Sequence, residues 1–263
     1  HTVQANPKDT DPQVQIERAK AADVIMIANM PLKGEVISAC PELKFIDVAF
    51  TGVDHVDLDA AREMGVAVSN AAGYSEQSVA ELVVGQMIHL LRNVPAVENR
   101  CRNGGTKDGL VGNELGSSVV GIVGVGAIGS RVATLCRAFG STVIGYVPHP
   151  SEHNRALLTY VSLEELLQRA DIVTLHCPLT PETRGLIGRE QLALMKPSAY
   201  LINMARGPVV DAQAVADALN QGKIAGAAID VFEKEPPLNT DEPLLHAKNC
   251  LLTPHIAFAS HQS

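Results

Sequence analysis

Three polar residues, Arg206, Glu235 and His255, each follow a short apolar segment of the sequence. A guanidinium group can bind a carboxylate through two parallel hydrogen bonds, and an imidazole can donate a proton near neutral pH. The three residues therefore predict a catalytic site for a small anionic substrate with a carbonyl group. The segments before them have the length and composition of buried strands: AYLINMA, AGAAIDV and NCLLTP.

The composition is that of an ordinary globular protein. The 263 residues are 46% hydrophobic and 19% charged, which suits one or two domains with a sizeable core. A formal net charge of -8 without a block of Lys or Arg disfavours nucleic acid and anionic membranes as partners. Glu81 and His89 interrupt the longest apolar stretch, so we expect no membrane-spanning segment and a cytoplasmic location.

The number and spacing of the cysteines limit the kinds of site that they could form. The five cysteines are an odd number and show no CxxC spacing, which favours reduced thiols over a disulfide framework or a metal site. We expect each of them to be a buried structural residue: Cys40, Cys101, Cys136, Cys177 and Cys250.

The first third of the chain alternates strand-like and helix-like segments. Residues 22–28, LKFIDVAF and VAVS predict three strands, with helices near 34–39 and 57–64 between them. Apolar residues then recur at helical spacing from Ser75 to Leu91, which predicts a long connecting helix. The segment 93–117 is rich in Gly, Asn and charge, and we interpret it as an irregular excursion.

Six further apolar segments, from Ser118 onward, alternate with helical patterns. This alternation predicts a doubly wound parallel sheet with helices on both faces. In the usual strand order 3-2-1-4-5-6, ligands bind beyond the carboxyl ends of the strands where the order reverses. Arg206 and Glu235 would follow the fourth and fifth strands at that point, and His255 would follow the sixth strand.

The first of these strands runs into the sequence GVGAIG, in which Gly124, Gly126 and Gly129 match GxGxxG. Such glycines permit a tight turn, let backbone amides approach a diphosphate, and allow close helix packing. A glycine-rich turn without a ligand is the alternative. Its position at the start of a six-strand series favours a dinucleotide site.

The expected ribose-binding acid is absent. About twenty residues after the glycines, Tyr146, Val147 and Pro148 stand where an Asp or Glu would hold the 2′-hydroxyl of NAD. The following residues could accept the 2′-phosphate of NADP or could be a solvated turn, so NAD and NADP both remain open: Ser151, His153 and Arg155.

Several motifs in fixed order resemble the D-isomer-specific 2-hydroxyacid dehydrogenase family. NMARG (203–207), DVFEKEP (230–236) and TPHIA (253–257) follow GVGAIG in the family order. The resemblance implies an α/β fold, with a Rossmann-type doubly wound dinucleotide-binding domain inserted in a smaller flavodoxin-like α/β substrate domain. It extends upstream through further motifs: TGVDHVD (51–57), SVAEL (78–82) and HCPLTPETRGLIG (176–188).

The domain boundaries follow from the same resemblance. We expect a substrate domain over residues 1–72 that lacks the family's first strand and helix. The dinucleotide-binding domain would span 73–257, including the connecting helix 75–91. Residues 258–263 would begin the return to the substrate domain. The family also implies a homodimer, formed through the nucleotide domain and the 93–117 excursion.

The resemblance implies reduction of a 2-keto acid to the D-2-hydroxy acid, and the reverse, with NAD(H) or NADP(H). Arg206 would bind the substrate carboxylate and polarise the keto oxygen, while His255 would act as the general acid. Glu235 would hold the imidazole and favour its protonated form. Because the formate-acting branch of the family carries Gln at this position, Glu235 favours keto-acid reduction.

Further contacts are carried over from the family motifs. The backbone amides of Thr51 and Gly52, with Met30, would contact the substrate. Asp230 would accept a hydrogen bond from the nicotinamide carboxamide. The residues implied to bind the cofactor are Ser78, Gly124, Gly126, Ala127, Ile128, Gly129, Val147, His176, Pro178, Met204, Ala205, Asp230 and Ala257.

Other interpretations stay open for these residues. His255 could be a structural histidine, Arg206 could form a surface ion pair, and Glu235 could be a solvated turn residue. Fold alone does not decide function, so a nucleotide-sensing corepressor on the same scaffold is a second hypothesis. Turnover of a 2-keto acid would separate an enzyme from such a sensor.

Overall fold

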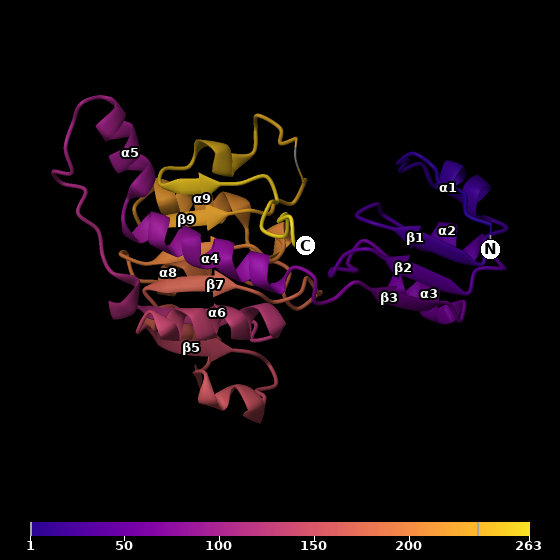
Figure 1. Cartoon of the computed structure of the whole chain (residues 1–263), viewed down its shortest axis with the longest axis horizontal. Coiled ribbons are helices and arrows are strands. Elements are labelled where there is room, and N and C mark those ends of the chain that lie inside the picture. Colours follow the sequence, from indigo (N-terminus) through magenta and orange to yellow (C-terminus); the bar gives the residue numbers. More distant parts are fainter. Residues whose placement is uncertain (1, 236) are drawn as a thin grey trace. The chain divides into compact units, whose positions relative to one another are not determined.

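The computed structural model describes residues 2–235 and 237–263. His1, the first residue of the expected substrate domain, and Pro236, the last of the DVFEKEP motif, lie outside the described residues. The chain divides into two compact units, with the division between Tyr74 and Ser75 (Figure 1). Residues 258–263 cluster with the second unit.

The first unit is a three-stranded parallel sheet with the order β1-β2-β3. The predicted strands and helices are present, and a further helix, α1, precedes them. This helix was not predicted from the sequence, although Asp11 caps it by accepting a hydrogen bond from the amide of Gln13. The elements are α1 (Pro12–Ala19), β1 (Val24–Ile27), α2 (Gly34–Ser38), β2 (Phe45–Val48), α3 (Leu58–Glu63) and β3 (Ala67–Asn70).

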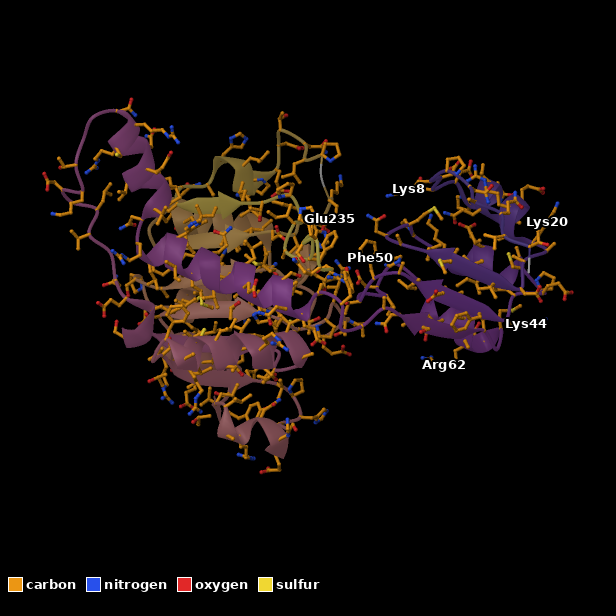
Figure 2. All side chains as sticks on the ribbon, in the orientation of Figure 1. Lys8, Lys20, Lys44, Phe50, Arg62 and Glu235 are labelled. Atoms are coloured by element: carbon orange, nitrogen blue, oxygen red, sulfur yellow. The ribbon has the colours of Figure 1, made fainter. Side chains whose placement is uncertain are left out.

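In the first unit, apolar side chains form a buried core and charged side chains lie on the surface. Val36, Ile46 and Val48 are fully buried in its core. Lys44 and Arg62, labelled in Figure 2, form exposed ion pairs, Lys44 with Asp23 and Arg62 with Asp59 of its own helix. Because the strands are parallel, their carboxyl ends share one edge, so the loops 28–32 and 49–56 emerge together there.

The second unit contains a seven-stranded parallel sheet with the order β10-β9-β8-β7-β4-β5-β6 (Figure 1). The six apolar segments form six of these strands, and the seventh is β6, a short strand that follows β5 in the sequence and lies at the edge of the sheet beside it. The strands are β4 (Val119–Val123), β5 (Thr142–Tyr146), β6 (Thr159–Tyr160), β7 (Ile172–Leu175), β8 (Tyr200–Asn203), β9 (Gly226–Ile229) and β10 (Cys250–Leu252).

The extra strand corrects the predicted strand numbering. The third strand of the doubly wound order is β6, and DIVTLHC is the fourth strand, directly beside β4. The order therefore reverses between β4 and β7, whereas Arg206, Glu235 and His255 follow the fifth, sixth and seventh strands. The prediction failed because β6 has only two residues, too few to show a periodic pattern.

Helices cover both faces of this sheet, as continuous apolar strands require. Ile122 and Ile202 are buried against α4 and α6 on one face, while Val123 and Leu201 are buried against α7, α8 and α9 on the other. The covering helices are α4 (Glu76–Leu91), α6 (Ala127–Ala138), α7 (Leu163–Arg169), α8 (Arg189–Leu194) and α9 (Ala212–Asn220).

The segment predicted as an irregular excursion contains a helix. α5 (Val94–Arg102) begins with a proline in its first turn, and Glu98 pairs with Arg102 one turn later. None of its residues is buried, and Figure 1 shows it extending away from the sheet of the second unit. Cys101 lies exposed on this helix, so the prediction that every cysteine is buried was wrong there.

Two other expectations concern the cysteines and membrane-spanning segments. Their cysteines are free thiols, and burial raises the pKa of the Cys136 thiol to about 12. Within residues 2–235 and 237–263, no helix has both the length and the apolar character needed to cross a bilayer.

Candidate active site

Arg206 is positioned by the asparagine that ends β8. The Asn203 side chain is fully buried, and its Nδ2 donates to the carbonyl oxygen of Arg206 at 2.9 Å. Its Oδ1 accepts from the amide of Ala205 at 3.1 Å, so both ends of the amide group hold the turn after the strand. The Arg206 side chain is half-buried and donates from Nη1 to the Ala205 carbonyl at 2.7 Å.

The residue after Arg206 brings two strand ends into contact. A Cβ atom on Gly207 would lie 2.1 Å from the carbonyl carbon of Phe232 and 2.6 Å from the amide of Glu233. Only glycine permits such a close approach of two backbones. The turn that carries Arg206 therefore lies directly against the segment that leads from β9 to Glu235.

The imidazole of His255 and the carboxylate of Glu235 are in direct contact. Nδ1 of His255 lies 3.1 Å from Oε2 of Glu235, whose side chain is labelled in Figure 2. The two side chains are 35% and 44% exposed, so both remain accessible to a ligand. Phe258 contacts the imidazole edge to face, with ring centroids 5.4 Å apart and planes at 89°. Because Glu235 binds Nδ1, the other ring nitrogen, Nε2, is directed away from the carboxylate.

The backbone of His255 is in the left-handed region, with φ at 57°. For a residue with a Cβ atom this conformation costs about 1–3 kcal/mol, and such strain is concentrated at functional sites. Asp230, which is fully buried, holds this turn through hydrogen bonds. Its carboxylate accepts from the amides of Ile256 and Ala257, both at 2.9 Å, and from the hydroxyl of Thr253.

Asp230 therefore holds the two peptide groups that follow His255 and the Thr253 hydroxyl that precedes it. We expect Asp230→Ala to lower the free energy of unfolding by about 3 kcal/mol, because two backbone donors lose their acceptor. Urea denaturation measures this loss. Asp241→Ala, at an exposed aspartate, is the matched control and should change the free energy of unfolding by less than about 0.5 kcal/mol. Equal effects of the two changes would contradict the role given to Asp230.

The glycine-rich turn after β4 shows the geometry of a phosphate cradle. A Cβ atom on Gly124 would lie 2.5 Å from the amide of Cys177, and one on Gly129 would lie 2.2 Å from the Gly124 carbonyl oxygen. Gly126 instead has nothing within 4 Å and is the N-cap of α6. Open space at a helix N-terminus suits a diphosphate, so these residues fit a dinucleotide. The first residues of α6 are Ala127 and Ile128.

The other residues predicted to contact a cofactor lie in the second unit. His176 follows β7, with Nε2 2.9 Å from the Thr174 hydroxyl, and burial lowers the pKa of its imidazole to about 4. The ring is therefore neutral at physiological pH. Ser78 lies on α4 and donates to the Ser75 carbonyl at 3.0 Å, and Pro178 accepts from the Thr183 hydroxyl at 2.6 Å. Three others pack in the apolar core: Met204, Ala205 and Ala257.

Three further residues predicted to contact the substrate, Thr51, Gly52 and Met30, lie in the first unit. Thr51 and Gly52 belong to the loop after β2, and Asn70 holds this loop by donating from Nδ2 to the Thr51 carbonyl at 2.6 Å. The Met30 side chain packs against the apolar core of the same unit.

Sequence reasoning missed Asn203 and Asn70. Each is the last residue of a strand. Asn203 binds the backbone of the loop that follows its own strand, and Asn70 binds the backbone of the loop that follows the neighbouring strand. An asparagine at a strand end, directly before a motif that carries chemistry, is the signal that could have identified Asn203.

The chain is similar to known proteins of one family. A family model described as "D-isomer specific 2-hydroxyacid dehydrogenase, NAD binding domain" matches residues 84–257. A D-3-phosphoglycerate dehydrogenase of Methanocaldococcus jannaschii is 42% identical over 91% of this chain. This chain covers 46% of that relative, about half of its length.

Solved structures show the same fold. D-Lactate dehydrogenase from Aquifex aeolicus, complexed with NAD and lactic acid, matches with a TM-score of 0.88 and 34% identity, covering 94% of this chain and 80% of that one. An acyclic imino acid reductase, in complex with NADPH and D-Arg, matches with a TM-score of 0.89 and 29% identity, covering 96% and 81%.

Proposed function

The chain belongs to the D-isomer-specific 2-hydroxyacid dehydrogenase family, and on that premise we propose that it reduces a 2-keto acid to the D-2-hydroxy acid and catalyses the reverse reaction. It would do so as an NAD(P)-dependent oxidoreductase. A bound nicotinamide cofactor would supply or accept the hydride. The observation that carries the proposal is the Glu235–His255 pair beside the strand end that presents Arg206.

Each of the three residues has a distinct task in this proposal. The Arg206 guanidinium binds the substrate carboxylate and polarises the keto oxygen. His255 donates a proton from Nε2 to that oxygen during reduction and takes it back during oxidation. Glu235 accepts the hydrogen bond from Nδ1 and so fixes the tautomer and orientation of the ring.

Each unit by itself carries proposed binding residues. In the second unit, the open space at Gly126 and the N-terminus of α6 would hold the cofactor diphosphate. In the first unit, the backbone amides of Thr51 and Gly52 and the side chain of Met30 are the proposed substrate contacts. Asp230 already has acceptor bonds to Thr253, Ile256 and Ala257, and a carboxamide would add a further donor.

Turnover tests this function directly. The protein is expected to oxidise NADH or NADPH in the presence of at least one of glyoxylate, hydroxypyruvate, pyruvate, phenylpyruvate or a branched 2-keto acid, followed by absorbance at 340 nm. Binding of nicotinamide cofactor without oxidation by any of them would instead favour a nucleotide sensor.

The diphosphate cradle has its own test. Gly126→Ala is expected to lower the affinity for NADH by about tenfold or more, because the added methyl group fills the space through which a diphosphate approaches the α6 amides. The melting temperature should stay unchanged, because no atom lies within 4 Å of that methyl group. Fluorescence titration measures the affinity. Gly85→Ala, which also meets no neighbour within 4 Å, is the control and should leave affinity unchanged.

We also propose that the protein is a cytoplasmic homodimer. The nine-residue helix α5 has no buried residue, and so short a helix is marginal in water without tertiary packing. A second copy of the chain would supply that packing. The free cysteines of the described residues support a reducing compartment.

A further inference from the structure

Phe258, three residues after His255, packs against the imidazole that acts as the acid in the proposed reaction. The two ring centroids lie 5.4 Å apart, and the ring planes are at 89°. Aromatic rings prefer this edge-to-face arrangement, with centroids about 4.5–7 Å apart, because the edge of a ring is positive and its face is negative. The contact between the two rings is therefore attractive as well as close.

The ring of Phe258 is itself held in place. Phe258 is half-buried and packs against the apolar cluster that also contains Ala257. Its carbonyl oxygen lies 3.4 Å from the hydroxyl of Ser78 on α4. Asp230 accepts a hydrogen bond at 2.9 Å from the amide of Ala257, which lies between Phe258 and His255 in the chain. A ring anchored in this way can restrain the side chain that it contacts.

The contact with Glu235 does not by itself fix the imidazole. It holds one ring atom, Nδ1, at 3.1 Å, so the ring can still turn about that contact and change the direction of Nε2. The Glu235 side chain is also 44% exposed, so burial does not hold it. The perpendicular contact with Phe258 restricts the remaining freedom, because turning the imidazole would break the edge-to-face geometry. The two contacts together fix the plane of the ring and the direction of Nε2.

We propose that Phe258 is a positioning residue for His255, whose imidazole it holds with Nε2 directed toward the keto oxygen of the substrate. The inference rests on the proposed function, in which His255 donates a proton from Nε2. Because Phe258 acts through His255, its replacement should lower kcat while KM stays nearly unchanged. A side chain that contacted the substrate instead would change KM, and by an amount that depends on the keto acid.

Steady-state kinetics of Phe258→Leu measures this effect. Leucine fills part of the space but has no aromatic ring, so kcat should fall by about 2–12-fold, the effect of losing one aromatic pair. The fold loss should be the same for glyoxylate, which has no side chain, and for the largest keto acid that the protein reduces. Phe258→Tyr keeps the ring and should keep kcat within about twofold of the wild type.

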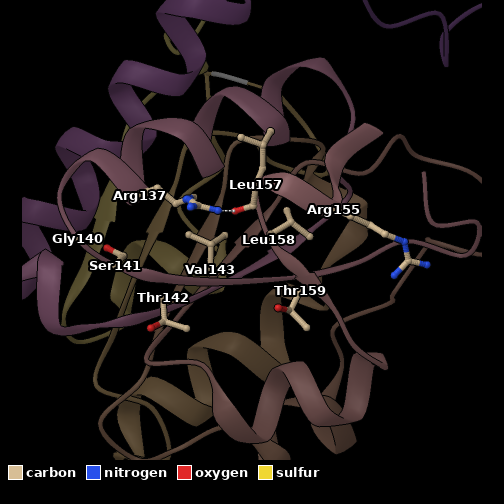
Figure 3. Close-up of a pocket in the computed structure, with 9 residues that line it drawn as sticks. All are labelled: Arg137, Gly140, Ser141, Thr142, Val143, Arg155, Leu157, Leu158 and Thr159. Carbon is tan, nitrogen blue, oxygen red and sulfur yellow. Dashed lines mark hydrogen bonds between the residues drawn. The ribbon is translucent and has the colours of Figure 1, made fainter. Parts of the chain in front are cut away.

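Phe139 provides the matched control for this substitution. It is the C-cap of α6 and is 52% exposed. In the chain it lies between Arg137 and Gly140, which line a cavity of about 320 Å³ at that end of the helix (Figure 3). Because α6 begins at the glycine-rich turn, its last residues lie at the opposite edge of the sheet from His255. Phe139→Leu should therefore leave kcat within about twofold of the wild type.

A second measurement needs no turnover. Two-dimensional NMR spectra of ¹⁵N-labelled histidine distinguish the two tautomers of a neutral imidazole, and His255→Ala identifies the signals of His255. The wild type and Phe258→Tyr should show the tautomer with the proton on Nδ1, because that proton is donated to Glu235. Phe258→Leu should show a mixture of both tautomers, because a ring that turns loses this hydrogen bond part of the time.

Three results would overturn the inference: an unchanged kcat in Phe258→Leu, a loss with the large keto acid but not with glyoxylate, or the same single tautomer in Phe258→Leu as in the wild type. The NMR result separates this inference from the proposed function. If no keto acid is reduced but Phe258→Leu shows mixed tautomers, the positioning of the imidazole stands and the proposed reaction fails. If keto acids are reduced and the tautomer does not change, the reverse holds.

Discussion

Replacing His255 with alanine is expected to lower kcat for keto-acid reduction by about 10²–10⁴-fold, the range that a positioned general acid contributes. The imidazole is the proton donor in the proposed reaction, and alanine leaves the substrate oxygen without one. Affinity for NADH should stay nearly unchanged, because the glycine-rich turn belongs to a different strand end. Steady-state kinetics and fluorescence titration measure the two quantities separately.

A matched control is available on α4. His89 is exposed in the last turn of that helix, so His89→Ala should leave kcat within about twofold of the wild type. Reduction at the wild-type rate by His255→Ala would exclude His255 as the acid.

The second large effect is expected for Arg206→Lys. Lysine keeps the positive charge but cannot form two parallel hydrogen bonds to a carboxylate. Loss of one charge-assisted hydrogen bond corresponds to about 1.5–3 kcal/mol, so kcat/KM should fall by about 10–150-fold. Steady-state kinetics with the best keto acid of the panel measures this change.

The specificity of that effect can be checked with a second arginine. Arg62 is exposed and pairs with Asp59 on the surface of the first unit, so Arg62→Lys should leave kcat/KM unchanged. The fold of Arg206→Lys can be compared by its circular dichroism spectrum and melting temperature. A loss of activity no larger than that of Arg62→Lys would remove Arg206 from the proposed substrate site.

Much of the second unit was predictable because its strands are buried on both faces. Continuous apolar segments such as the one before Arg206 identify strands of a parallel sheet, and parallel strands bring their carboxyl ends to one edge. The polar residues that follow those strands could therefore be placed near one another from the sequence. The close approach of Glu235 and His255 agrees with that reasoning.

The features that the sequence did not reveal depend on backbone contacts. β6 is held through its pairing with β5, where Ile144 is opposite Thr159, and two residues carry no periodic signal. Helix α5 has nine residues and buries none of them, so packing against the core gives no signal of it. The supports of Arg206 and His255, Asn203 and Asp230, act through peptide groups, which every sequence contains.

The left-handed backbone of His255 has a consequence for the evolution of this site. Glycine would relieve the strain at that position, and asparagine or aspartate would tolerate it better than most residues. Substitutions that increase the stability of the fold would therefore replace His255. Only selection for the chemical role of the imidazole can retain histidine at this position. Among relatives that have lost the reaction, this position should be among the earliest to change, and glycine or asparagine should be common replacements.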